Sequence, residues 1–192
     1  MTDKEKILEA AQKYVLKGQT KKAIKEYLKL IEASPKDKRL YLKVGDLYLK
    51  EGESDKAIKV YLELADLYME DDLNFRAISV YKKILSIDPK FVEPLSKLAE
   101  LYLKEGLTGS AKTYYQNILD INPDDYEALA YHFERAGESE QARIFHLRAA
   151  EQAAELADMK DAADHFQAAL ENWPGTDPDG RAAIEEKLEN YL

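Results

Sequence analysis

The sequence predicts an all-α solenoid of about eleven helices that pair into hairpins. Three observations support this prediction. A phrase of about seventeen residues recurs along the chain, apolar residues within each copy lie three and four positions apart, and no segment alternates polar with apolar residues as a strand does. Because residues three and four apart share one face of a helix, each copy is expected to form an amphipathic helix.

The repeat consists of four aligned columns of residues. An alanine column contains Ala23, Ala57, Ala77, Ala111, Ala142 and Ala162. Four residues later, an aromatic column contains Tyr27, Tyr61, Tyr81, Tyr115, His146 and Phe166. Nine residues before each alanine, a second aromatic column contains Tyr14, Tyr48, Tyr68, Tyr102 and Phe133, with Ala153 as the exception. Three residues earlier, a column of small residues contains Ala11, Gly45, Ala65, Ala99, Ala130 and Ala150. Small residues let two helices approach, and rings fill the remaining space, so these columns are the predicted core.

Turn signals separate the helices. The first helix begins with a capping-box pattern, Thr2 with Glu5. In the segments Lys-Gly-Gln-Thr at 17–20 and Glu-Gly-Glu-Ser at 51–54, glycine is expected to end one helix, and Thr20 or Ser54 to cap the next.

The spacing of the repeats is uneven, with successive alanines 34, 20, 34, 31 and 20 residues apart. Where the gap is 20, one helix has to serve two hairpins, which predicts two three-helix overlaps around shared helices at 54–70 and 139–157. A closing proline would interrupt such a helix, and Met69 and Ala154 occupy its column there. The regular repeats do close with a proline, at Pro35, Pro89, Pro123 and Pro174.

The two irregular segments align with each other at an offset of 85 residues, 38–91 with 123–176. We therefore predict a single domain, 1–192, that contains duplicated five-helix modules at 4–91 and 92–176 and a C-terminal capping helix within 177–192. Trp173 is expected to pack beneath that last helix, since repeat arrays need a polar end piece. We hypothesise that the extra helix of each module divides the concave surface into two grooves.

The small–aromatic–alanine–aromatic–proline pattern, at about 34 residues, resembles the tetratricopeptide repeat over residues 4–176. The usual tryptophan of the first helix is replaced by Ile7, Tyr41, Tyr61, Leu95, Tyr126 and His146. The resemblance implies a right-handed solenoid whose first helices line a concave groove that holds a partner peptide or helix. The Lys/Glu-rich repeats resemble bacterial scaffold proteins of this family.

Carrying the resemblance over predicts the residues that line the grooves. The first module would offer Leu8, Gln12, Val15, Leu42, Asp46, Leu49, Lys50, Leu62, Asp66 and Met69, a largely apolar set that suits an apolar helix or strip. The second would offer the more polar set Ser96, Glu100, Leu103, Lys104, Glu127, Tyr131 and Arg135. Some of these leucines could instead pack between helices. The lysine–asparagine clamp of chaperone-binding members is absent, because Leu8, Gln12, Leu42 and Asp46 occupy its positions.

The charge is unevenly distributed. The net charge is −9, with +3 in residues 1–91 and −12 in residues 92–192. The acidic half favours a basic partner and repels phosphate backbones, so nucleic acid is not an expected ligand.

Little in the sequence indicates catalysis. There is no cysteine, Gly-rich phosphate loop, Gly-x-Ser-x-Gly elbow or His-Glu-x-x-His motif. The three histidines, His132, His146 and His165, are not spaced as helical metal ligands; His146 is expected in the core and His165 on the solvent side. We therefore predict no enzyme activity, no cofactor and no metal.

The leading interpretation is a non-catalytic protein–protein interaction scaffold. The alternative is a structural subunit that self-associates into a homo-oligomer. No apolar run approaches the length of a membrane span, and no signal peptide precedes the first helix. These absences predict a cytoplasmic protein, or a piece of a longer one.

Overall fold

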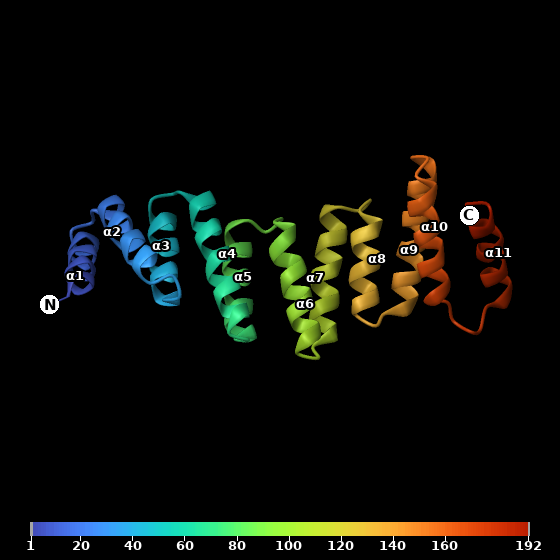
Figure 1. Cartoon of the computed structure of the whole chain (residues 1–192), viewed down its shortest axis with the longest axis horizontal. Coiled ribbons are helices and arrows are strands. Elements are labelled where there is room, and N and C mark those ends of the chain that lie inside the picture. Colours follow the sequence, from blue (N-terminus) through green and yellow to red (C-terminus); the bar gives the residue numbers. More distant parts are fainter. Residues whose placement is uncertain (1, 192) are drawn as a thin grey trace. The chain divides into compact units, whose positions relative to one another are not determined.

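The computed structural model describes residues 2–191, and within them it contains eleven α-helices and no strand (Figure 1). This confirms the predicted all-α fold of helical hairpins. The chain divides into two compact units, Met1–Leu98 and Ala99–Leu192, with the boundary inside α6. The helices are α1 (Asp3–Leu16), α2 (Thr20–Ala33), α3 (Lys38–Lys50), α4 (Ser54–Glu70), α5 (Asn74–Ile87), α6 (Val92–Lys104), α7 (Thr108–Ile121), α8 (Tyr126–Arg135), α9 (Ser139–Glu155), α10 (Met159–Glu171) and α11 (Pro178–Glu189).

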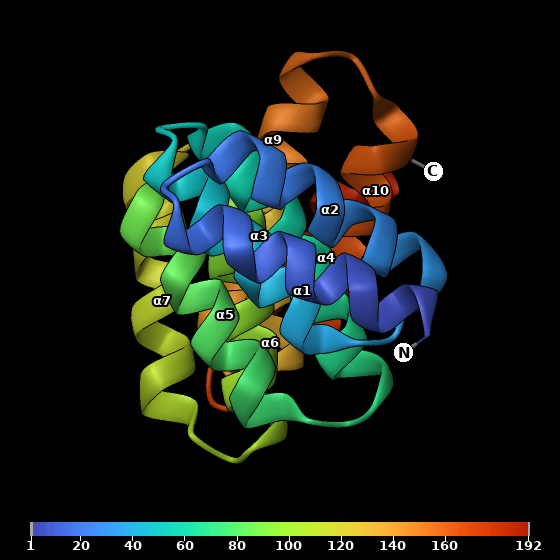
Figure 2. The ribbon, with the colours of Figure 1, turned by 90° about the vertical axis from the view of Figure 1, so that its left-hand side faces the viewer.

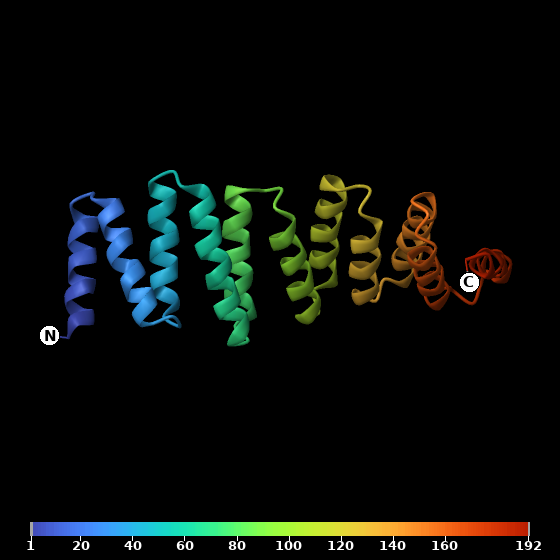
Figure 3. The ribbon, with the colours of Figure 1, turned by 45° about the horizontal axis from the view of Figure 1, so that its top comes forward.

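From α1 to α5, consecutive helices run antiparallel and each packs against the next (Figure 3). Figure 2 shows the α1–α2 hairpin from its own end of the chain. Helix α4 packs against α3 about as extensively as against α5, so it is the second helix of one hairpin and the first of another. This confirms the first three-helix overlap, and α4 begins and ends where the spacing of the alanines placed it.

The second unit contains the other overlap. Helix α9 packs extensively against both α8 and α10. It ends at Glu155 rather than at residue 157, because Ala157 adopts a left-handed backbone with φ of 60° that closes the turn into α10. The duplication of a five-helix module, 4–91 and 92–176, stays a prediction.

The alanine column, the first aromatic column and the column of small residues form the core of each unit, whereas Tyr14, Tyr48 and Tyr68 of the second aromatic column are only partly buried. All six alanines of the alanine column are fully buried, and every ring of the first aromatic column is at most 6% exposed. In the first unit, Gly45 of α3 lies directly against the ring of Tyr61 from α4. The small residue therefore determines how closely the two helices approach.

The capping box at the start of α1 is confirmed, since Thr2 Oγ1 accepts from the Glu5 amide and Glu5 Oε2 accepts from the Thr2 amide. The prediction that Thr20 and Ser54 cap α2 and α4 is wrong. Each is the first residue inside its helix, and the N-cap residues Gln19 and Glu53 make no side-chain cap hydrogen bond. The turn is closed by the backbone instead, as where the Gln19 amide donates to the Tyr14 carbonyl at 2.9 Å.

The rings at the hairpin turns are covered differently in the two units. In the first unit, a cation eight residues later lies 5.6–5.8 Å from the ring centroid, in the pairs Tyr14–Lys22, Tyr48–Lys56 and Tyr68–Arg76. In the second unit, a second ring covers the first, in the stacked pairs Tyr102–Tyr114 at 5.6 Å and Phe133–Phe145 at 5.3 Å. At these two turns of the second unit an aromatic pair therefore takes the place that a cation–π pair has in the first unit.

Helix α11 covers the apolar face of α10. Its Ile184 and Leu188 join Phe166 and Leu170 in one buried cluster. Trp173 packs against this cluster, and its indole N–H donates to the carbonyl of Asp177 at 2.8 Å. The expected place of Trp173 beneath the last helix is therefore confirmed.

The expectation for His165 is wrong. Its side chain is not on the solvent side, since the residue is only 9% exposed and its Nδ1 lies 3.0 Å from Nδ1 of His146. His146 is buried as predicted. The error arose because the adjacent Phe166 fixes only one side of α10, whereas this helix packs against both α9 and α11.

Candidate functional site

The predicted groove residues of the first unit lie at the surface. None is fully buried, and Leu8 and Leu42 are 38% and 39% exposed. Their spacing places them along one face of each helix, since Leu8, Gln12 and Val15 follow at i, i+4 and i+7 in α1. We call the following residues the first-unit surface: Leu8, Gln12, Val15, Leu42, Asp46, Leu49, Lys50, Leu62, Asp66 and Met69.

Asp46 is the residue of this surface that has the most defined partners. Its Oδ1 accepts a hydrogen bond from the Tyr61 hydroxyl at 2.6 Å and another from Lys83 Nζ at 2.7 Å. The Lys83 ammonium also lies 5.2 Å from the centroid of the Tyr61 ring. Burial, reinforced by the Asp46 carboxylate, raises the pKa of Tyr61 well above its ordinary value, so the hydroxyl stays protonated and donates. This network joins α3, α4 and α5 at the surface.

The second unit presents a smaller polar group. Arg135 Nη1 donates to the Tyr131 hydroxyl at 2.7 Å, one turn apart on α8, and this hydrogen bond raises the pKa of the guanidinium. Tyr131 is 48% exposed. Glu100 of α6 is near enough to act electrostatically on Arg135. We call the following residues the second-unit surface: Glu100, Leu103, Lys104, Glu127, Tyr131 and Arg135.

Tyr115 of α7 lies beneath this second-unit surface. Its ring is fully buried and stacks on His132 at 4.9 Å, and within residues 2–191 its hydroxyl has no hydrogen-bond partner. Burial raises the pKa of Tyr115 to about 12, and the Glu100 carboxylate contributes to the shift. At neutral pH the hydroxyl is therefore a neutral donor and acceptor.

Sequence reasoning placed Tyr61 and Tyr115 in the core and did not identify Lys83. The rings are indeed buried, but the Tyr61 hydroxyl extends to the surface residue Asp46. The tyrosines of the aromatic column could have indicated this polar contact, because a tyrosine carries a hydroxyl that a phenylalanine lacks. Nothing in the sequence indicated that Lys83 contacts Asp46, since the two residues are 37 positions apart.

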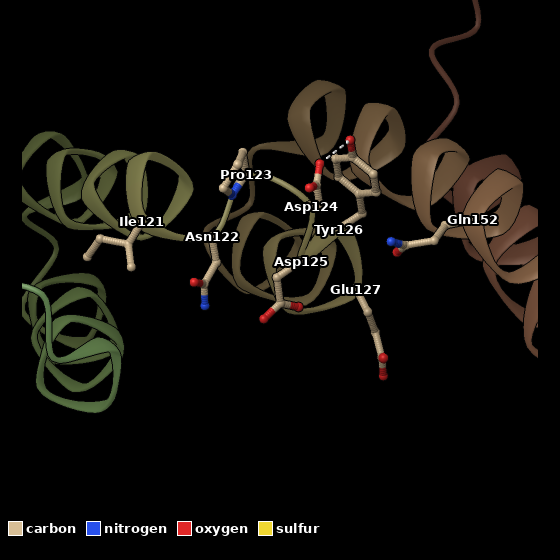
Figure 4. Close-up of a pocket in the computed structure, with 8 residues that line it drawn as sticks. All are labelled: Ile121, Asn122, Pro123, Asp124, Asp125, Tyr126, Glu127 and Gln152. Carbon is tan, nitrogen blue, oxygen red and sulfur yellow. Dashed lines mark hydrogen bonds between the residues drawn. The ribbon is translucent and has the colours of Figure 1, made fainter.

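A hollow of about 490 Å3 lies where α7 leads into α8, beside α9 (Figure 4). The Tyr126 hydroxyl donates to Asp124 Oδ1 at 3.2 Å on its rim, and Asp125 caps α8 by accepting from the Ala128 amide. Glu127 of the second-unit surface also lines it. The lining contains acids, amides and one phenol but no histidine, serine or lysine. Its residues are Ile121, Asn122, Pro123, Asp124, Asp125, Tyr126, Glu127 and Gln152.

In the part of the chain that the structure describes, no three His, Asp or Glu side chains gather as metal ligands would. Over the same residues, no helix combines the length and apolarity of a membrane span.

Family models of the tetratricopeptide repeat match residues 8–72, 59–91 and 76–132. Together they span residues 8–132, which is more than half of the chain. The chain belongs to the tetratricopeptide repeat family. Members of this family are generally protein–protein interaction scaffolds and generally not catalysts. The resemblance drawn from the aligned columns is thus confirmed.

Several solved structures are similar to this chain at low sequence identity. BtubC (BKLC) from P. vanneervenii is 16% identical, with a TM-score of 0.50 over 100% of this chain and 91% of that one. A tetratricopeptide repeat protein from Parabacteroides merdae is 18% identical, with a TM-score of 0.42 over 98% of this chain and 79% of that one. MamA is 21% identical, with a TM-score of 0.38 over 88% and 91%. Comparison with curated proteins gives no match.

Proposed function

We propose that this tetratricopeptide repeat protein is a non-catalytic adaptor that binds a segment of another protein along the first-unit surface. The observation that supports this most is the equivalent exposure of Leu8 and Leu42, which are 34 residues apart and occupy the same place in consecutive repeats. Leu40 and Leu47, on another face of the same α3 helix, are buried. Exposed leucines that recur in register fit an apolar strip or helix face.

Asp46 gives this surface a fixed polar point. Because Tyr61 and Lys83 hold its carboxylate in place, Asp46 is already oriented before a partner arrives. The network is near neutral in charge, so it favours a partner that hydrogen-bonds rather than one that is highly charged.

The second-unit surface is proposed to contact a basic part of the same partner or of another one. Residues 92–192 carry a net charge of −12, which attracts basic segments and speeds their association. Such an interaction weakens as salt rises, whereas apolar contacts with Leu8 and Leu42 do not.

The expected cytoplasmic location stays a prediction, to be tested by cell fractionation.

Self-association through the end helices, the alternative function, has less support. Helix α3 buries Leu40 and Leu47, and α1 carries Lys6 and Lys13 at the same positions of the repeat. The charged face of α1 resembles the polar end that a repeat array needs for solubility. A dimer that persists at low micromolar protein in sedimentation would favour the alternative.

The proposal predicts that a Leu42→Asp/Leu49→Asp variant loses its partner. Two carboxylates in the strip would have to be desolvated on binding, so captured partner is expected to fall at least about tenfold. The measurement is quantitative affinity capture from native lysate with the wild-type chain and the variant as baits.

The matched control is Phe75→Asp, which places a carboxylate on an equally apolar residue that is 65% exposed on α5 and lies outside the proposed surface. Far-UV circular dichroism has to show that all three baits are folded. If the double variant and the control recover the same proteins as the wild-type chain, the first-unit surface is not the binding surface.

A further inference from the structure

Two buried histidines face each other across the α9–α10 hairpin. His146 of α9 and His165 of α10 are 6% and 9% exposed, and their Nδ1 atoms lie 3.0 Å apart. At that distance one Nδ1 has to donate a proton to the other, because two lone pairs or two N–H groups would repel.

The second nitrogen of each ring faces a carboxylate. His146 Nε2 lies 3.8 Å from Oε2 of Glu134 on α8, and His165 Nε2 lies 3.8 Å from Oδ1 of Asp161 on α10. Glu171 of α10 adds negative charge near His146. Since a carboxylate favours a proton on the nitrogen that it faces, both Nε2 atoms favour the N–H form.

The four ring nitrogens therefore have places for three protons. Each Nε2 carries one, and the two Nδ1 atoms share the third. Two neutral rings carry only two protons together, so the arrangement suits a pair with a single positive charge between the carboxylates. A fourth proton would set two N–H groups against each other at 3.0 Å and leave two imidazolium rings in a buried site.

We propose that His146 and His165 form a proton-linked latch: the folded pair accepts one proton, and a second proton at acidic pH separates α9 from α10. The latch is independent of the proposed function. Its consequence would extend to α8, because Glu134, which faces His146, lies on the same helix as Tyr131 and Arg135 of the second-unit surface.

The pKa of His146 agrees in direction, since burial first and the neighbouring His165 second lower it below its ordinary value. A lowered folded-state pKa means that the unfolded chain, whose histidines titrate near pH ~6.5, binds more protons below that pH. The stability contributed by the neutral His146 is therefore present above about pH 6.5 and is lost as the pH falls below it.

A bridging metal ion fits the pair less well. Two nitrogens bound to one tetrahedral zinc ion lie about 3.3 Å apart, which is farther than this pair. Among residues 2–191, no group of three or more potential ligands includes these histidines.

The test uses chemical denaturation of the full chain, followed by far-UV circular dichroism between about pH 5 and pH 8. For the wild-type chain, the unfolding equilibrium constant is expected to rise by up to tenfold for each pH unit below about 6.5, as linkage to one proton requires. His146→Tyr takes the residue found 85 positions earlier, Tyr61, and is expected to lose this dependence. His165→Val takes Val80 and is expected to reduce it, because His146 stays buried but no longer faces a second imidazole.

His132→Phe is the matched control, because His132 is a buried histidine of α8 that stacks on Tyr115 rather than on the pair. It is expected to keep the part of the pH dependence that the His146–His165 pair contributes. Equal slopes in the wild-type chain and in both pair variants would overturn the latch, as would a loss of the slope in His132→Phe alone.

Nitrogen-15 NMR of the wild-type imidazoles provides a second measurement that needs no variant. When the pair carries its single positive charge, we expect both Nε2 atoms to be protonated and the Nδ1 atoms to share one proton. Two rings that titrate independently near pH ~6.5 would contradict the latch. A zinc-induced rise in Tm that both pair variants abolish would show a metal site instead.

Discussion

Replacing Gly45 by leucine is expected to lower the free energy of unfolding by about 3 kcal/mol. A side-chain carbon at position 45 would overlap the ring of Tyr61. That ring has little freedom to move, because it is fully buried and its hydroxyl is bound to Asp46. Chemical denaturation of the full chain, followed by far-UV circular dichroism, measures the change.

The matched control is Gly109→Ala in α7, where a methyl group would meet no atom within 4 Å. In a helix, alanine is favoured over glycine by about 1 kcal/mol at most, so this variant is expected to be neutral or slightly more stable. If Gly45→Leu is as stable as the control, α3 and α4 are not held at the distance that the small residue allows, and the packing argument is wrong.

Replacing Met69 by proline is expected to cost about 3 kcal/mol or more, because the ring removes a helical N–H and clashes with the preceding turn. Met69 occupies the column where the regular repeats have a proline, but here α4 continues to Glu70. Its last turn also carries Tyr68, whose ring lies 5.7 Å from Lys38 Nζ and 5.8 Å from the Arg76 guanidinium. A broken last turn would therefore disturb the contacts of α4 with both α3 and α5. Thermal and chemical unfolding of the purified variant measure the loss.

Met69→Ala is the control that separates backbone from side chain, since it shortens the side chain but retains the N–H. Ala154→Pro provides an independent repetition in α9, the second shared helix. Proline variants that are no less stable than Met69→Ala would mean that neither shared helix needs to be continuous, and the explanation of the missing prolines would fail.

The spacing of residues predicted the helices and the core. Alanine and aromatic columns fix which face of each helix is apolar, and this periodicity is local to ten or twenty residues. The same spacing identified α4 and α9 as shared helices, because a gap of 20 residues leaves no room for a separate pair. The turn chemistry was less predictable, since Thr20 and Ser54 lie inside their helices and the backbone closes the turns.

The candidate site could be predicted only in part. The family resemblance predicted Leu8 and Leu42 on the groove face of α1 and α3. Both residues are exposed, and their contact with a partner stays a prediction. The hydrogen bond from Lys83 to Asp46 could not be predicted, because it joins α5 to α3 across α4 and depends on the conformation of a flexible lysine side chain.

The sequence alone determined the helical repeat and its buried columns, because residues that share a helix face are three or four positions apart in the sequence. What only the tertiary structure decided is which polar groups meet. His146 and His165 lie on different helices, 19 residues apart, and the packing of α9 on α10 places their Nδ1 atoms 3.0 Å apart. Periodicity predicts on which face of its own helix a side chain lies. The distance and angle between two helices depend on the packing of all the side chains between them.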